Sequence, residues 1–147
     1  MKPIRHVLCA TDLSATSRKA LVTATALAKS TNATLTILHV SPPPVVAPEQ
    51  LFDAMTMDRL QKRIRAWGIR ELQKLSVRAN RDGVTTSVLL RAGEPTDQII
   101  RAAKSEKADL IVMGTHGRRG LTRLFMGSVA QRVVGLAPCA VVTVRGR

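Results

Sequence analysis

The chain has 147 residues, of which 45% are hydrophobic, so it is long enough to form one globular domain with a substantial core. Its 23 Lys and Arg residues outnumber its 10 Asp and Glu residues, and the resulting net charge of +13 favours acidic partners such as nucleotides, nucleic acid, anionic lipid surfaces or acidic proteins. No apolar run approaches the ~20 residues that cross a bilayer, and the apolar run from Val7 to Ala10 is too short for a signal-peptide core, so we expect a cytoplasmic protein without membrane insertion.

The first part of the chain alternates strand-like and helix-like segments. Residues 4–10 are mostly apolar and predict a buried strand, and Ser14 suits the N-cap of the helix predicted over residues 15–30. Residues 33–40 alternate polar and apolar side chains before they become apolar, which is typical of a strand. The proline-rich stretch 41–48 can be neither regular helix nor inner strand, so it predicts an extended connector.

A long helix is predicted next, beginning at about Glu49 or Asp58 and ending at Arg81, where Asp82-Gly83 supplies a stop signal. Its larger apolar residues lie along one side: Leu60, Ile64, Trp67, Leu72 and Leu75. Its many cations could form a polyanion-binding face, but long basic side chains on a helix are more commonly a solvated outer surface, and we favour that interpretation: Arg59, Lys62, Arg63, Arg65, Arg70, Lys74, Arg78 and Arg81.

The remaining elements continue the alternation. A strand is predicted over 84–90, a short helix from Pro95, a strand over 110–113, a helix from Ser128 or Val129 to Leu136 and a last strand over 140–144. Strands that alternate with helices from end to end indicate a single α/β domain over residues 1–147, with an open parallel sheet covered by helices on both faces.

Cysteine and histidine offer little chemistry of their own. Cys9 and Cys139 both fall in predicted apolar strands, so we expect small buried thiols rather than a disulfide or a redox pair. His6, His39 and His116 lie far apart without Cys or acidic residues at ligand spacing, so no metal site is expected. We interpret His6 and His39 as ordinary strand residues.

The most informative segment joins the fourth strand to the last helix. Gly114-Thr-His-Gly117 is followed, after nine residues, by Gly127-Ser128-Val129. Glycines between a strand and a helix suit a phosphate cradle, because glycine adopts positive φ and lets an anion approach backbone N–H groups, and the helix start adds further donors. The alternative is a flexible surface loop that happens to be rich in glycine.

This spacing resembles the nucleotide-binding motif of the universal stress protein family. Residues 4–14 are similar to the family's first strand and acidic turn, although the family more often has proline where this chain has Ala10. Val40 precedes a proline-rich loop as in the family, and residues 108–120 and 137–144 also fit. The resemblance covers nearly the whole chain, about residues 2–145, and implies a Rossmann-like sheet of order 3-2-1-4-5.

In that order, the turn after the first strand and the glycine segment after the fourth meet where open α/β sheets bind ligands. The resemblance implies ATP as the ligand, and it leaves open AMP, cyclic AMP and an accompanying Mg²⁺. The residues that it assigns to the nucleotide are Thr11 and Asp12 for adenine and ribose, the backbone of Val40 for the adenine edge, Met113 near the ribose or base, and Gly114, Gly117, Gly127, Ser128 and Val129 for the phosphates.

Several of these assignments have alternatives. Asp12 could instead make an Asx turn before Ser14, and Met113 could simply fill the core. Nearby cations could strengthen phosphate binding, or could be solvated or contact a second subunit: His116, Arg118, Arg119 and Arg123.

The predicted function is that of an ATP-binding stress-response protein, a nucleotide-responsive regulator that forms a homodimer through its last strand, Ala140 to Val144, and has no assigned catalytic residue. One alternative is a slow ATPase or adenine-nucleotide hydrolase, for which His116 is the candidate base. The other is a polyanion-binding module that uses the basic surface. Nucleic acid is disfavoured, because single-strand readers need aromatic stacking platforms and only 2% of the residues are Phe, Trp or Tyr.

Overall fold

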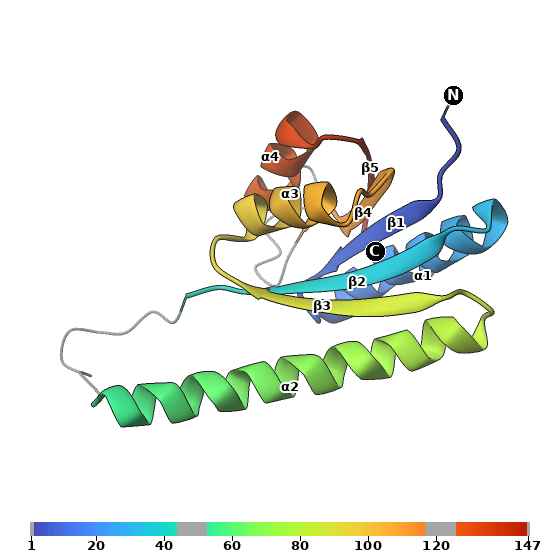
Figure 1. Cartoon of the computed structure of the whole chain (residues 1–147). Coiled ribbons are helices and arrows are strands. Elements are labelled where there is room, and N and C mark those ends of the chain that lie inside the picture. The colour runs from blue at the N-terminus through green and yellow to red at the C-terminus, as the bar shows by residue number, and fades with distance from the viewer. Residues whose placement is uncertain (1, 44–52, 117–125, 147) are drawn as a thin grey trace.

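The computed structural model describes residues 2–43, 53–116 and 126–146, and within them strands and helices alternate along the chain (Figure 1). The elements are β1 (His6–Thr11), α1 (Ala15–Thr31), β2 (Thr34–Ser41), α2 (Ala54–Arg81), β3 (Thr86–Ala92), α3 (Pro95–Ser105), β4 (Leu110–Gly114), α4 (Ser128–Leu136) and β5 (Ala140–Val144). The first three strands begin and end slightly later than predicted. Most of the predicted proline-rich connector lies outside the described residues.

The strands form one five-stranded sheet in the order β3-β2-β1-β4-β5, and every neighbouring pair is parallel. This confirms the predicted fold class and strand order. Because the sheet is parallel, all the strands end at the same edge, and β1 lies in the middle between β2 and β4. That edge is where loops from different parts of the chain come together.

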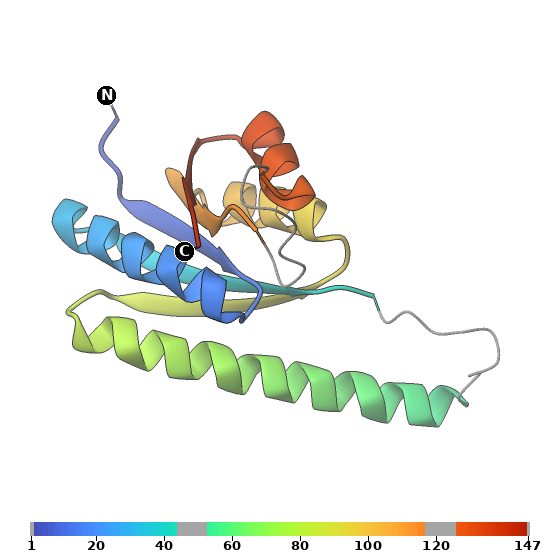
Figure 2. The same ribbon diagram turned by 180° about the vertical axis from the view of Figure 1, so that it is seen from behind.

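Helices cover both faces of the sheet, with α1 and α2 on one side and α3 and α4 on the other (Figures 1 and 2). Successive strand residues point to opposite faces. In β1, Val7 and Cys9 pack in the cluster that includes α1 and α2, whereas Leu8 and Ala10 pack in the cluster that includes α3 and α4. Because residues 7–10 of β1 are all apolar, this central strand contributes to the core on both faces, as expected for parallel sheets.

The first three helices begin at side-chain caps. Ser14, Asp53 and Glu94 each accept a hydrogen bond from the backbone N–H three residues on, as an N-cap does. Those hydrogen bonds lower the pKa of the Asp53 and Glu94 carboxyls below their usual range. Gly83, at φ +86°, follows the last turn of α2 in a conformation that favours glycine. No helix within the described ranges combines the length and the apolar character needed to cross a membrane.

The predicted apolar side of α2 is covered along only part of its length. Leu72 is fully buried, but Leu60, Ile64 and Trp67 are 39%, 38% and 42% exposed. Figures 1 and 2 show the first part of α2 extending beyond the sheet. The stripe is continuous in sequence, but the strands do not reach its beginning.

The two cysteines differ. Cys9 is fully buried in β1, and burial raises the pKa of its thiol to about 12, so the interpretation as a buried thiol is confirmed. Cys139 immediately precedes β5 and is only partly buried, so its predicted place within a strand is wrong. Partial burial, followed by the nearby charge of Asp109, raises the pKa of its thiol as well.

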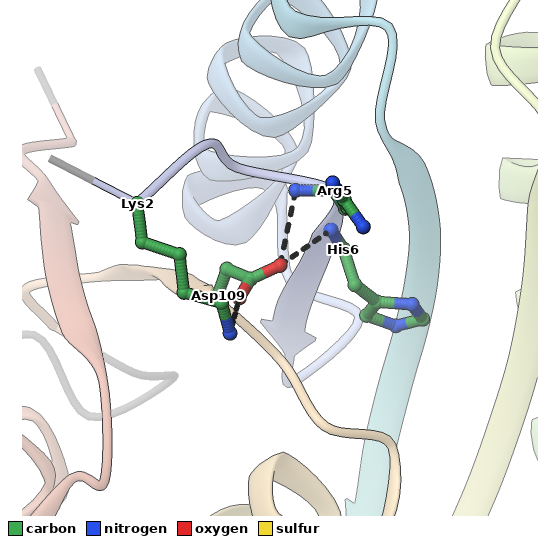
Figure 3. A network of polar contacts seen from close by, with 4 residues as sticks. All are labelled: Lys2, Arg5, His6 and Asp109. Carbon is green, nitrogen blue, oxygen red and sulfur yellow. Dashed lines mark hydrogen bonds and ion pairs between the residues drawn. The ribbon is translucent and has the colours of Figure 1, made fainter.

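Asp109 ties the amino ends of β1 and β4 together (Figure 3). Its Oδ2 atom accepts the backbone N–H groups of Arg5 at 3.0 Å and His6 at 3.1 Å, and its Oδ1 atom lies 2.9 Å from the Lys2 Nζ atom. The bond from Lys2, then that from Arg5, lowers the pKa of the Asp109 carboxyl.

Replacing Asp109 by asparagine should lower the free energy of unfolding by about 1 kcal/mol near neutral pH, because the amide loses the charge-assisted bonds. The lowered pKa sets the pH dependence: the contribution is complete above the usual carboxyl pKa of about 3.9 and is lost as the pH falls through the lower folded-state value. Denaturant unfolding of wild type and variant should therefore converge in acid.

The matched control is Asp58→Asn, which removes an exposed i,i+4 pair with Lys62 on α2. That change should alter stability by less than about 0.5 kcal/mol. An Asp109 variant as stable as this control at neutral pH would contradict the stabilising role of the network.

Candidate functional site

The turn after β1 is held by its own side chains. The Thr11 hydroxyl lies 2.8 Å from the Ser17 hydroxyl and accepts the Leu13 N–H at 3.0 Å. The Asp12 Oδ1 atom accepts the Ser14 N–H at 3.0 Å, so the Asx-turn alternative for Asp12 is realised. An ionised carboxylate accepts more than one hydrogen bond, so this bond is compatible with a ligand contact. Leu13 has φ +65°, a conformation that L residues rarely adopt.

The neighbouring strand β2 supports this turn. His39 lies in β2, as predicted, and is buried there. Its Nδ1 atom lies 2.9 Å from the Thr11 carbonyl oxygen. Val40 follows it and is buried in the cluster shared with α3 and α4. His39 therefore links the carboxyl ends of β1 and β2.

The register of the sheet brings the two predicted site segments together. Ala10 of β1 pairs with Met113 of β4, so the next residues, Thr11 and Gly114, lie on adjacent strands at the carboxyl edge. Met113 is buried in the core cluster on the α3 and α4 side, as its core-filling alternative predicts.

Beyond β4, Thr115 connects three segments. Its N–H donates to the carbonyl oxygen of Val144 in β5 at 2.9 Å, and its own carbonyl accepts the Gly127 N–H at 2.6 Å. Its side chain is buried, and its hydroxyl lies 2.9 Å from His116 Nδ1. Thr115 thus holds the start of α4 against the end of β4.

Gly127 is a glycine because of close approach, not because of positive φ. Its φ is −60° and its ψ is 152°, so the prediction of a positive φ is wrong at this position. Gly114 is also absent from the described glycines with positive φ, which are Gly83 and Gly93. A Cβ atom on Gly127 would lie 3.0 Å from the Thr115 carbonyl oxygen, tighter than ordinary van der Waals contact.

The start of α4 lacks the caps of the other three helices. Its N-cap residue is Gly127, which has no side chain to accept a hydrogen bond. The first turn, which includes Ser128 and Val129, has no acidic residue. The first N–H groups of a helix have no partners within it, and the helix dipole adds about half a positive charge there. This end of α4 therefore suits an anion.

His116 adds a polar group beside that helix start. Its Nε2 atom is buried and has no hydrogen-bond partner within the described part of the chain. A buried nitrogen without a partner costs on the order of 1–3 kcal/mol, so a ligand that bonds to it would gain from it.

Some predicted residues lie outside the described residues: Gly117, Arg118, Arg119 and Arg123. Of the others, the structure brings Thr11, Asp12, Val40, Met113 and Gly114 to one edge of the sheet, and the contact between Gly127 and Thr115 brings the start of α4 to the same edge. Across residues 2–43, 53–116 and 126–146, no group of three His, Cys, Asp or Glu side chains could hold a metal ion.

Three residues that shape the site were not singled out from the sequence. Thr115 stands between two predicted site residues, directly after a strand, and this position was a usable signal. His39 and Leu13 carried no such signal, because a hydrogen bond across strands and a positive φ at leucine depend on tertiary contacts.

The family model and the relatives similar to this chain all point to one family. Residues 3–145 match the Universal stress protein family. The universal stress protein YxiE of Bacillus subtilis is 34% identical over 144 residues, which are 95% of this chain and 97% of that protein. A universal stress protein of Thermus aquaticus, from the QAH/OAS sulfhydrylase 3′ region, is 38% identical over 143 residues, 96% of this chain and 98% of that protein.

Solved structures share the fold. UspA from Lactobacillus plantarum has a TM-score of 0.84 at 24% identity, covering 99% of this chain and 100% of that chain. A universal stress protein in complex with cAMP has a TM-score of 0.73 at 24% identity over 98% of both chains. A universal stress protein family protein from Arabidopsis thaliana with AMP bound has a TM-score of 0.65 at 20% identity, covering 97% of this chain and 92% of that chain.

Proposed function

Since the chain belongs to the universal stress protein family, we propose that it is an ATP-binding regulator of stress resistance, in the branch of the family that keeps the nucleotide motif. Residues 1–147 would form one nucleotide-binding domain in the cytoplasm. ATP occupancy would bias the conformation of the protein or its choice of partner, without fast turnover.

The observation that carries this proposal is the uncapped start of α4 beside the carboxyl end of β4. Three described helices have a side-chain cap and α4 has none, while the Gly127 N–H contacts the Thr115 carbonyl at 2.6 Å. A terminal phosphate is a ligand that would satisfy such a helix start. The buried Nε2 atom of His116 next to it favours the same ligand.

The proposed contacts divide between two strands. Thr11 and Asp12 would bind the ribose and adenine, Val40 would offer its backbone to the adenine edge, and Met113 would pack near the ribose or base. The groups proposed for the phosphates are the backbone of Gly114, Gly117, Gly127, Ser128 and Val129, with His116, Arg118 and Arg119 as supporting contacts. Mg²⁺ is an optional companion of the phosphates in this proposal.

An adenine nucleotide is favoured by two fold neighbours, one in complex with cAMP and one with AMP bound. We propose ATP rather than these, because the Gly-x2-Gly-x9-Gly-Ser spacing resembles the family's nucleotide motif, which implies a triphosphate.

The test is to denature the purified protein, identify any released nucleotide by chromatography, and titrate the stripped protein with ATP, AMP and cyclic AMP by calorimetry. We expect about one nucleotide site per chain and a micromolar dissociation constant for ATP. Asp12→Ala should weaken all three ligands, whereas His116→Ala should weaken ATP most. A stripped, folded protein that ignores all three would refute the proposal.

His116 also favours a second function, slow hydrolysis of ATP, because it is a titratable group placed beside the proposed phosphate site. Steady phosphate release that disappears in His116→Ala, while ATP still binds, would support this enzyme. Release that persists in the variant would exclude His116 as its base.

We also propose a homodimer through β5. This strand is at the edge of the sheet, and exposed apolar side chains of α4, Val134 and Leu136, lie on the preceding helix. Pairing with a second copy would cover the strand edge. Sedimentation velocity measures this directly, and a monomer at micromolar concentration would contradict it.

A further inference from the structure

The first part of α2 carries an interaction surface that the nucleotide site does not use. Residues 58–67 are all exposed, whereas the buried residues of the helix, Gly68, Leu72 and Ala79, all lie after them. Leu60, Ile64 and Trp67 form the exposed apolar stripe here, each about two-fifths exposed. Their spacing of four and three residues places them on one side of the helix.

A line of arginines flanks this stripe. Arg59, Arg63 and Arg70 are separated by four and seven residues, so they lie on one side of α2. Arg63 and Arg70 line a shallow groove on the helix surface together with Ile64, Ala66 and Trp67. None of these three arginines has an ion-pair partner in the described residues.

The local charge is strongly one-sided. Residues 54–70 contain five basic residues, Arg59, Lys62, Arg63, Arg65 and Arg70, and one acidic residue, Asp58. Asp58 is already paired with Lys62. An occupant of this surface must therefore bring its own negative charge as well as apolar side chains.

We propose that this surface, residues 59–70 of α2, binds an acidic amphipathic helix of a partner protein. Apolar side chains of the partner cover Leu60, Ile64 and Trp67, and its carboxylates pair with Arg59, Arg63 and Arg70. This is the helix-packing mode in which apolar anchors recur at helical spacing and charges beside them select the partner. The surface spans less than half of α2, so the area that a partner can bury is small and the contact is weak and reversible.

Two other occupants fit the observations less well. A second copy of this surface would bring like charges together, which is unfavourable. A membrane-surface helix needs a broad apolar face, whereas this stripe consists of three partly exposed side chains. The proposal is independent of the proposed nucleotide function, since no site residue lies on α2.

Trp67 makes the surface directly observable, because it is the only tryptophan of the chain and lies within the stripe. The probe is a synthetic helical peptide of about 18 residues, without Trp or Tyr, that carries Leu on one side and Glu on the flanks. Full-length protein titrated with it at low salt should show a saturable blue shift of Trp67 emission. A scrambled peptide of identical composition should not cause this shift.

Charge-reversal variants test the assigned arginines. Arg63→Glu with Arg70→Glu should weaken peptide binding at least about tenfold. A peptide with Lys in place of Glu should bind this double variant better than it binds wild type. The matched control, Arg18→Glu with Arg101→Glu, changes the same charge at exposed positions on α1 and α3 and should stay within about twofold.

Four outcomes would overturn the proposal. In the first, the amphipathic peptide causes no shift of Trp67 emission. In the second, the scrambled peptide and poly-glutamate cause the same shift, which means that the surface recognises negative charge alone. Vesicles with anionic lipid shift the emission while the peptide does not, which means a membrane. The protein alone shows a concentration-dependent shift that Ile64→Glu removes, which means a second copy.

Discussion

Valine at position 127 should lower the affinity for ATP by at least about 100-fold and leave the sheet folded. The substituted Cβ atom would lie 3.0 Å from the Thr115 carbonyl oxygen, so the start of α4 must move away from β4. The free backbone N–H groups of Ser128 and Val129, at the start of α4, then leave the proposed phosphate position. Losing about two charge-assisted hydrogen bonds of roughly 1.5–3 kcal/mol each corresponds to a factor of 100 or more. Calorimetric titration of the stripped variant with ATP measures the loss.

The same helix supplies the matched control. Gly135 also belongs to α4, and a Cβ atom there would meet nothing within 4 Å. Gly135→Val should therefore bind ATP like the wild type, and both variants should keep the wild-type circular dichroism spectrum. If Gly127→Val is folded and binds ATP normally, the start of α4 is not a phosphate site and the proposed function loses its main support.

Alanine in place of Leu72 should lower the free energy of unfolding by roughly 3 kcal/mol. Leu72 is fully buried in the cluster between α2, α1 and the sheet. Removing a buried leucine side chain loses its transfer free energy and leaves a cavity, which together cost about 2–5 kcal/mol. Urea unfolding followed by circular dichroism measures the change, and the midpoint should shift without a change in slope.

Leu60→Ala is the matched control, because it makes the same substitution twelve residues earlier in the same helix. Leu60 is 39% exposed, so its truncation should cost less than about 1 kcal/mol. Equal losses at both positions would mean that the first part of α2 is covered in solution and would contradict the packing described above.

Much of the fold could be predicted, because its signals are local. The apolar strands, the Ser14 cap, Pro95 at the first turn of α3 and the stop at Gly83 all lie within a few residues of the feature that they specify. The resemblance to the family supplied the strand order, which local patterns do not contain. Cys139 was misplaced because an apolar residue beside a strand has the same pattern as one within it.

The position of the candidate site could be predicted from the sequence, but the reason for one of its glycines could not. The sequence placed the Asp12 turn and the Gly114 segment after strands, and the observed register puts those strands side by side. It assigned Gly127 a positive φ, whereas the structure has φ −60° and a close contact with Thr115. A glycine in the sequence is compatible with either reason, and only the neighbouring chain segment distinguishes them.

By itself, the sequence determined the alternation of strands and helices, the two-sided apolar character of the strands and the spacing of the glycine segment. Each of these depends on hydrophobic period and backbone preference within one stretch of chain. Only the tertiary structure decided that Leu72 is buried while Leu60, Ile64 and Trp67 are exposed on the same stripe. It also decided that Thr115 holds α4 against β4. Burial and close approach depend on segments far apart in sequence, and no local pattern records which of them will meet.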